Sequence, residues 1–464
     1  MKNNTILLLV TMALVAAVGC KKAPVEPTNE IENINTWIYD NLKDVYFWTD
    51  KIPATANKSL APLDFFESLL YRFDATQRPD GDRFSWIQPN ADQLVAALSG
   101  ESRSTGAEFQ LYLKTNSNEL AGRILYVMPN SPAALGGIKR GDIFFRLVVD
   151  GKVLTRDNYT TLLGSSNEYL FVRGIYQNDF VPVGESKTLN AVVLQENPLH
   201  LDSVYVRGGK TIGYLMYNQF VAGPNGAKEP LFNQKMDQIF ARFKARGINE
   251  LILDLRYNPG GSSTASNNLA SLVAKGVTAN DVFARRQYNP AFQAAIEKQY
   301  GADFLLDKFQ AKAMNVGSNL RRVFVLTSTR TASASELIIN GLQPYMEVVV
   351  IGDKTVGKNV GSITIKDDTR KIQWGMQPIV AKSFNSLGKS DYTSGFTPKV
   401  TVRELLAVDL VPIGDLRDPL LGEAMFQITG SRTARLNAAR TSATDENAVG
   451  SSIDRKPGGY FLDN

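Results

Sequence analysis

The chain has 464 residues, of which 44% are hydrophobic and 21% are charged, so it holds enough apolar material for the cores of about three domains. The formal net charge of +5 is small for this length, and no Lys/Arg run or aromatic-basic pattern indicates nucleic-acid binding. One histidine and one cysteine in the whole sequence leave no Cys/His cluster for zinc and no disulfide within the chain, so we expect neither a metal nor a cofactor.

The first 19 residues have the features of a secretory signal peptide. Lys2 gives a short basic start, and residues 6–18 form an apolar run that is too short to span a membrane with any margin. The run leads into Ala-Val-Gly-Cys, which resembles a bacterial lipobox and predicts cleavage before Cys20 with acylation of its thiol and amino group. A plain secretory signal with an incidental cysteine is the alternative. Lipidation would anchor the protein to a membrane of the bacterial cell envelope, at the outer membrane or on the periplasmic side, without a spanning helix.

Residues 20–30 are polar and contain two prolines, and we interpret them as a tether between the anchor and the fold. From residue 31 to residue 100, apolar residues recur at helical spacing and predict an N-terminal helical domain. The residues that share one face are Ile34, Ile38, Leu42, Val45 and Trp48. We expect this face to pack against neighbouring domains, and a ligand groove lined by its aromatic residues is the alternative.

Residues 101–197 consist of short strands and turns around one motif. The sequence ILYVMPNSPAALGGIKRGDIFFRLVVDGKVL, residues 124–154, has a strand, a Ser-Pro-Ala helix start, a glycine-rich turn and a second strand, and it resembles a PDZ domain of the protease-associated kind. In such domains an upstream loop takes the terminal carboxylate of a peptide that adds as a strand. The candidate peptide-binding residues at that place are Gly106, Ala107, Glu108 and Phe109. A domain that only props its neighbour is the alternative.

Residues 205–430 alternate strand and helix patterns, which predicts an α/β domain. The sequence NELILDLRYNPGGSS, which starts at Asn249, places Gly260 and Gly261 in the turn between a strand and a helix. Glycines there let the backbone approach a substrate closely. Residues 281–320 interrupt the alternation with an aromatic-rich segment, which is either a helical flap over the site or a surface excursion.

The end of the sequence divides at residue 431. Before it, further strands follow residue 362, and residues 415–430 predict a closing helix. Residues 431–464 are polar with few apolar residues, and we expect them to form a mobile C-terminal tail.

One stretch, residues 323–362, carries the strongest pattern for chemistry. A short β-branched run is followed by a small-residue turn, a segment with helical apolar spacing and a second buried strand. A strand, a turn and a helix can hold a serine at the helix N-terminus, where free N–H groups and the helix dipole stabilise a developing oxyanion. Ser333 and Ser335 are the candidate nucleophiles.

Such a serine needs a base. His200, the only histidine, has no acidic motif beside it, and we interpret it as an ordinary surface or strand histidine. Lys358 lies in TVGKNVG, just after the second buried strand, where burial would lower the pKa of its ammonium group. A serine and Lys358 would then form a dyad.

The sequences TASASELIINGL and VVVIGDKTVGKNVG together resemble the tail-specific, or C-terminal processing, serine protease family. The resemblance implies Ser333 as nucleophile and Lys358, 25 residues later (358 − 333), as base. It also implies an oxyanion hole made by the N–H of Ala334 and an N–H of the Gly260–Gly261 turn. Many family members carry a glutamine four residues after the lysine. Here Ser362 stands at that position as a possible third polar group, because its hydroxyl can accept a hydrogen bond.

The same resemblance implies an α/β multidomain fold. Its parts are an N-terminal helical segment, which includes DRFSWI at residues 82–87, a PDZ-like β-rich domain and a crotonase-like, ClpP/crotonase-type protease domain. The implied function is a serine endopeptidase that cleaves envelope proteins or peptides through an acyl-enzyme, selecting them by their C-termini. The alternatives are a non-hydrolytic ligand-binding protein and a PDZ scaffold with an inert protease fold. The sequence leaves the oligomeric state open.

Overall fold

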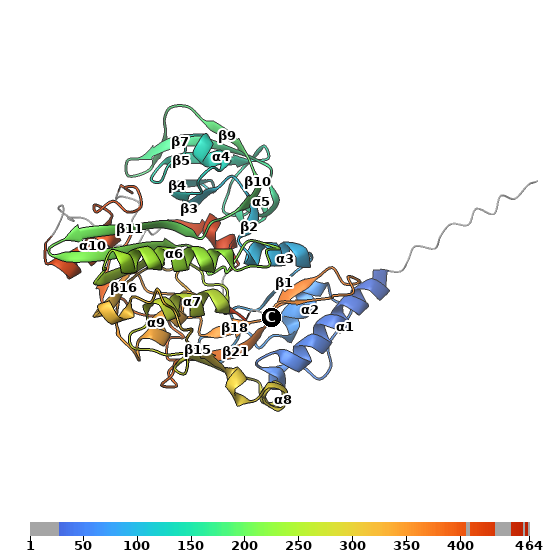
Figure 1. Ribbon diagram of the computed structural model, residues 1–464. Helices are drawn as coiled ribbons and strands as arrows, with labels where there is room; N and C mark the ends of the chain where they lie inside the picture. The colour runs from blue at the N-terminus through green and yellow to red at the C-terminus, as the bar shows by residue number, and fades with distance from the viewer. Residues whose placement is uncertain (1–26, 405–408, 432–446, 458–459, 463–464) are drawn as a thin grey trace, which may run out of the picture.

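The computed structural model describes residues 27–404, 409–431, 447–457 and 460–462. The predicted signal peptide and Cys20 lie outside these residues. None of the described helices is both long and apolar enough to cross a membrane. In Figure 1 a β-rich unit lies at the top of the molecule and the first two N-terminal helices lie at the lower right, with two further sheets between them.

The N-terminal part is helical, as the apolar spacing predicts. It comprises α1 (Pro27–Val45), η1 (Thr49–Lys51), α2 (Pro62–Leu69), β1 (Trp86–Gln88) and α3 (Ala91–Leu98). Ile34, Ile38 and Leu42 of α1 are buried against α2. The helix starts at Pro27, so the tether prediction is wrong for residues 27–30. Proline fits a first helical turn, and Glu30 lies in that turn, where its charge suits the helix dipole.

The β-rich unit follows. Its elements are β2 (Glu101–Ser104), β3 (Ala107–Leu113), β4 (Leu120–Val127), α4 (Pro132–Leu135), β5 (Ile143–Val149), β6 (Lys152–Val153), α5 (Tyr159–Ser165), β7 (Glu168–Tyr176), β8 (Phe180–Pro182), β9 (Lys187–Asn190) and β10 (Val192–Gln195). The sheet order is β23-β3-β4-β5-β7-β8, and the edge strand β23 (Ala448–Ser451) comes from the C-terminal segment. Phe109, Phe144 and Phe171 pack edge to face and fill a core that belongs to this unit.

The central sheet has the order β11-β12-β13-β16-β17-β22. Its strands are β11 (Leu199–Arg207), β12 (Lys210–Tyr217), β13 (Glu250–Asp254), β16 (Arg322–Thr327), β17 (Glu347–Gly352) and β22 (Val400–Thr401), all parallel except β11. Three helices pack on one face: α6 (Leu231–Ala245), α7 (Ser263–Val273) and α9 (Ala334–Leu342). Helix α10 (Pro419–Thr429), the predicted closing helix, packs on the other face. This is the mixed α/β architecture that the alternating pattern predicts.

A second sheet has the order β15-β14-β21-β18-β24. Its strands are β14 (Val282–Tyr288), β15 (Leu306–Lys308), β18 (Val360–Ser362), β21 (Ile379–Phe384) and β24 (Tyr460–Phe461), and the small neighbouring sheet β1-β20-β19 adds β19 (Ile365–Lys366) and β20 (Gly375–Gln377).

Residues 281–320 are a surface excursion only in part, because α8 buries Ile296 alone while strands on either side of it join this second sheet. They supply β14 and β15 to this second sheet, together with α8 (Pro290–Tyr300), η2 (Ala302–Leu305) and η3 (Gly317–Asn319). Strand β14 pairs with β21, a contact between segments far apart in the sequence, which the local pattern does not reveal. Asn289, at the start of α8, donates to the carbonyl oxygens of Asp44 and Tyr46 and so joins this segment to the N-terminal helices.

The prediction of a mobile tail is wrong for the described part of residues 431–464. Residues 448–451 form β23 (Ala448–Ser451), η4 (Ser452–Arg455) follows, and β24 joins the second sheet. Ile453 is buried in the core under α10, and Ser451 and Ser452 are buried as well. Few apolar residues are needed here because the segment is held mainly by backbone pairing with strands of the folded body.

Candidate active site

Ser333 lies between β16 and α9, at the N-terminus of the helix, as the strand-turn-helix pattern predicts. Its φ of 59° and ψ of −109° are a conformation that residues other than glycine rarely adopt. Two hydrogen bonds fix the turn. Thr331 Oγ1 donates to the carbonyl oxygen of Leu255 at 2.8 Å, and the Ala332 N–H donates to the carbonyl oxygen of Asn258 at 3.2 Å. Ser333 is therefore held at a strained turn by contacts to the loop that follows β13.

Ser335, the other candidate, has a different role. Its buried hydroxyl donates to the carbonyl oxygen of Asn258 at 3.1 Å. This contact ties the first turn of α9 to the loop that follows β13. The geometry favours Ser333 over Ser335 as the nucleophile.

Glu336 joins the serine turn to the lysine turn. Its Oε2 accepts the N–H of Ser333 and the N–H of Lys358, both at 2.8 Å. Its Oε1 accepts the N–H of Gly357 at 2.6 Å and the hydroxyl of Thr355 at 2.5 Å. Burial raises the pKa of this carboxyl group against the opposing effect of these four hydrogen bonds. The sequence offered a signal for it that we did not use, since Ser-x-x-Glu before an apolar run is the pattern of a capping box.

Lys358 is almost completely buried, with 4% of its surface exposed. Burial lowers its pKa to about 8, although the carboxylates of Asp82 and Glu336 oppose the shift. Its Nζ lies 4.9 Å from the centroid of the Phe84 ring. At pH 8, roughly half of the Lys358 side chains are therefore neutral and able to accept a proton.

The N-terminal region completes the surroundings of the lysine. Arg83 donates to the carbonyl oxygens of Gly357 and Thr393 at 2.7 and 2.9 Å. Asp82 is buried and accepts the hydroxyl of Tyr46 at 2.9 Å, which fixes its carboxylate. The resemblance assigned residues 82–87 to the helical part but did not predict that they surround the lysine. Arg83 and Gly357 are about 270 residues apart, and no local sequence pattern indicates such a contact.

The glycine turn after β13 lies directly against Ser333. Gly260 and Gly261 have φ values of 108° and 141°, and a Cβ on Gly260 would lie 2.9 Å from the Cβ of Ser333 and 3.0 Å from the nitrogen of Ala334. The structure thus brings together the four residues predicted for the nucleophile and the oxyanion hole. Asn258 Oδ1 accepts the N–H of Gly260 at 2.9 Å, so that donor is already engaged.

Ser362, the possible third polar group, lies on β18. Its hydroxyl donates to Oε1 of Gln377 at 2.7 Å, and the amide of Gln377 donates to Thr364 Oγ1 at 2.6 Å. Both Ser362 and Gln377 are buried. The family resemblance predicts a glutamine at position 362. The chain has Ser362 there, and Gln377 of β20 contacts the Ser362 side chain.

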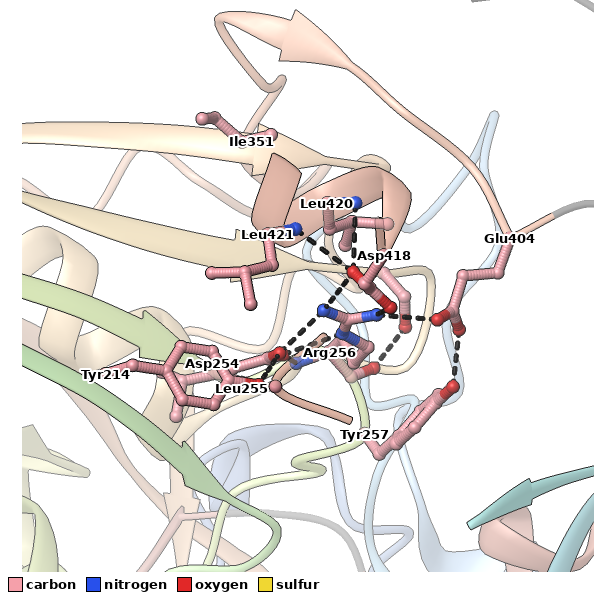
Figure 2. A network of polar contacts seen from close by, with 12 residues as sticks. Tyr214, Asp254, Leu255, Arg256, Tyr257, Ile351, Glu404, Asp418, Leu420 and Leu421 are labelled. Atoms are coloured by element: carbon pink, nitrogen blue, oxygen red, sulfur yellow. Dashed lines mark hydrogen bonds and ion pairs between the residues drawn. The ribbon is translucent and has the colours of Figure 1, made fainter. Parts of the chain in front are cut away.

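A buried ionic network supports the strand end that leads into the glycine turn (Figure 2). Arg256 donates to Asp254 at 2.6 and 2.8 Å, to Asp418 at 2.8 and 2.9 Å, and to Glu404 at 2.6 Å. Arg140 of the β-rich unit forms ion pairs with Glu404 and Asp418 and donates to the hydroxyl of Tyr257 at 2.7 Å. Burial alone would raise the pKa of Glu404, but Arg140 and Arg256 outweigh it and hold that pKa well below its usual range. The network joins the β-rich unit to the residues that precede the Gly260–Gly261 turn.

The remaining candidates lie in or beside the β-rich unit. His200 is on β11, its ring packs edge to face against Tyr126 at 5.2 Å, and burial lowers its pKa. This is a strand histidine, as we interpreted it. Gly106 precedes β3 with a φ of 83°, and Ala107, Glu108 and Phe109 are the first three residues of that strand. The N–H of Phe109 donates to Ser452 Oγ at 2.8 Å.

Comparisons with known proteins found family similarity over the part of the chain that holds both turns. The model of peptidase family S41 matches residues 211–402, and the model of the peptidase S41 N-terminal domain matches residues 33–86. A carboxyl-terminal-processing protease of Synechocystis is 26% identical over 269 residues, which is 58% of this chain and 55% of that protein. One from Picosynechococcus is 25% identical over 274 residues, 58% of this chain and 57% of the relative. The chain thus spans about half the length of the curated relatives that it matches.

A solved structure extends the similarity over most of the chain. The crystal structure of a Bacteroides fragilis protein assigned to the S41 proteases is 28% identical, has a TM-score of 0.68, and covers 85% of this chain and 97% of its own.

Proposed function

This chain belongs to peptidase family S41, the family of the carboxyl-terminal-processing proteases, and we propose that it is a serine endopeptidase that acts through a Ser333–Lys358 dyad. The chain carries a serine-type peptidase domain. The strongest support for the dyad is that the backbone N–H groups of Ser333 and Lys358 donate hydrogen bonds to the same atom, Oε2 of Glu336. Burial also lowers the pKa of Lys358 to about 8.

The first step is attack by the serine. Neutral Lys358 Nζ takes the proton of Ser333 Oγ as the new Oγ–C bond to the substrate carbonyl forms. The protonated lysine then gives that proton to the leaving amine, the C–N bond breaks, and an acyl-enzyme is left. A water molecule deprotonated by the same lysine hydrolyses the ester and restores the serine.

The oxyanion of each tetrahedral intermediate needs N–H donors that face Ser333. Ala334 is the first residue of α9, so the helix itself leaves its N–H without an acceptor. In the glycine turn the N–H of Gly260 is bonded to Asn258, which favours Gly261 as the second donor. Ser362, bonded to Gln377, is the third polar group of this proposal and would help to hold the lysine turn.

Several finer assignments belong to the same proposal. The β-rich unit is PDZ-type, and its strand β3 receives an extended peptide, with Gly106, Ala107, Glu108 and Phe109 at the end where the peptide enters or stops. The protease domain is crotonase-like. Cys20 carries a lipid anchor that holds the enzyme in the bacterial cell envelope, and the substrates are envelope proteins or peptides recognised through their C-termini.

The proposal is tested by incubating the purified protein with an unfolded protein and identifying the fragments by mass spectrometry. We expect internal cleavage that is absent from a Ser333→Ala preparation. Pairs of peptides that differ only in amidation of the C-terminus test the recognition step, because amidation removes the charged acceptor. Fragments of the same kind and amount from the Ser333→Ala protein would refute the dyad.

A further inference from the structure

Residues 447–452 lie along one edge of β3. Ala448 pairs with Tyr112 and Ser451 with Gln110, so β23 runs antiparallel to β3 toward its N-terminal end. Beyond the ladder, the N–H of Leu113 donates to the carbonyl oxygen of Asn447 at 2.8 Å. Ser451 Oγ donates to the carbonyl oxygen of Phe109 at 2.8 Å. Strand β4 pairs with the other edge of β3, so β23 takes the one edge at which a further strand can add.

Helix α5 closes the opposite side of this segment. A Cβ on Gly450 would lie 3.0 Å from the ring of Tyr159, and the guanidinium of Arg455 donates to the carbonyl oxygen of Leu163. Val449 packs against the core of the β-rich unit. The chain therefore places its own C-terminal segment in a groove between β3 and α5.

The same segment reaches the candidate active site (Figure 1 shows it in red beneath the β-rich unit). Strand β24 pairs in parallel with β18, which begins two residues after Lys358. The N–H of Phe461 donates to the carbonyl oxygen of Gly261 at 3.1 Å, and the N–H of Leu462 donates to that of Ser362 at 3.0 Å. Residues 460–462 thus bridge from the glycine turn to the strand behind the lysine.

Strand β18 can pair with an added peptide only at the edge that β24 occupies. Its other edge pairs with β21, and β24 is the last strand of the sheet. A peptide that used backbone pairing to lie between the glycine turn and β18 would need the positions that Phe461 and Leu462 occupy. Leu462 is buried there, so an apolar side chain suits the place.

We propose that residues 447–457 and 460–462 are a tethered ligand of the substrate path, so that an incoming peptide must displace them from β3 and from β18 before it is cleaved. This inference rests on the proposed function. The occupant is an extended peptide that includes Phe461 and Leu462, and an extended peptide is also the chemical class of the proposed substrate. Because the segment belongs to the same chain, its effective concentration at the groove is high, and a substrate in trans competes at a disadvantage.

Displacement of the C-terminal segment would also remove contacts to the turn that holds Ser333. The amide of Gln110 donates to the carbonyl oxygen of Gly450 at 2.8 Å, and the side-chain oxygen of Gln110 accepts a hydrogen bond from Arg330. Arg330 precedes Ser333 by three residues. It also forms an ion pair with Asp454 of the segment at 3.7 Å. A cavity of about 460 Å³ lies between β3, this turn and residues 448–454.

The test compares full-length proteins. Gly450→Val pushes a branched side chain against the Tyr159 ring and weakens β23, whereas Gly164→Val is the same change on α5 at a glycine with open space around it. We expect Gly450→Val to raise kcat/KM for a fluorogenic peptide about fivefold or more, and Gly164→Val to leave it unchanged. A labelled synthetic peptide of residues 447–462 should bind the Ser333→Ala/Gly450→Val protein more tightly than the Ser333→Ala protein, measured by fluorescence anisotropy.

The two readouts separate the two proposals. If no variant hydrolyses any peptide, the proposed function fails, while peptide binding still tests the occupied path because it needs no catalysis. Circular dichroism checks that Gly450→Val is folded. Hydrogen exchange on the Ser333→Ala protein, which keeps Gly450, supplies a second measurement, and we expect the amides of β23 and β24 to gain exchange when substrate peptide is added. Equal peptide binding by both proteins, with no change in exchange at β23 and β24, would overturn the inference.

Discussion

The backbone N–H groups of Ser333 and Lys358 donate to one atom, Oε2 of Glu336, at 2.8 Å each. The two residues belong to different turns, one before α9 and one before β18. A single buried carboxylate therefore sets the spacing of the two turns. The geometry of the proposed dyad depends on backbone hydrogen bonds as well as on the two side chains.

The role of Glu336 predicts the behaviour of Glu336→Gln. The amide keeps one acceptor oxygen but places an NH₂ group against N–H donors, so we expect kcat to fall by roughly 10- to 100-fold with little change in KM. In the wild-type protein the negative charge of Glu336 raises the pKa of Lys358 and so opposes the effect of burial. Loss of that charge in the variant therefore lowers the pKa of Lys358 further. The pH profile should shift to lower pH, which a purely structural defect would not cause. Glu347→Gln, at a half-exposed carboxylate on β17, is the matched control.

Single and double changes of the dyad test whether the two residues act as one unit. Ser333→Ala and Lys358→Ala should each reduce peptide hydrolysis to background, and the double variant should be no worse than either single variant. Ser335→Ala should keep substantial activity because its hydroxyl holds only the Asn258 carbonyl. His200→Ala should be nearly silent, since its ring packs on Tyr126. Steady-state kinetics on one fluorogenic peptide checks the series, and full activity of Lys358→Ala would remove the lysine from the mechanism.

The pKa of about 8 for Lys358 fixes the pH dependence. The base must be neutral, so kcat/KM should rise with pH and level off above pH 8, with an increase of roughly 50-fold between pH 6 and pH 8. The protein's fold should be monitored at each pH. A profile that is flat from pH 6 to pH 9 would contradict a lysine base.

Burial of Lys358 also has a cost in stability. Its pKa is lowered from 10.5 to about 8, so between these values the unfolded chain binds a proton that the folded chain lacks. Stability from this group is complete above pH 10.5 and is lost as the pH falls through 8, by about 3 kcal/mol in all. We expect Lys358→Met to be inactive but more stable to urea at pH 7 by a similar amount. The difference should shrink as the pH approaches 10, and a constant difference would argue against the lowered pKa.

The serine and lysine turns could be predicted from the sequence because each signal lies within one short segment. Residues 323–351 carry the strand, turn, helix and strand in order, and Lys358 follows directly. The structure reproduces that order in β16, α9 and β17. The N-terminal helices could also be predicted from the sequence, because α1 has a regular apolar face.

Contacts between distant segments could not be predicted in this way. Asp82 and Phe84 lie beside Lys358 because the N-terminal region folds back onto the second sheet, and no local pattern marks a residue for such a contact. The tail was misjudged for a related reason. Low apolar content predicts mobility only when backbone groups have no partner strand, and β3 and β18 supply partners to β23 and β24.

The backbone of Ser333 has a consequence for how this protein tolerates change. A φ of 59° with a ψ of −109° costs a residue with a Cβ about 1–3 kcal/mol, and glycine would largely avoid that cost. Ser333→Gly would therefore give a chain that folds more stably and does no chemistry. A library of variants screened for solubility or yield alone would be drawn toward this substitution, and the catalyst would be lost by the same selection that improves the protein. Any engineering of this enzyme needs an activity screen at each round.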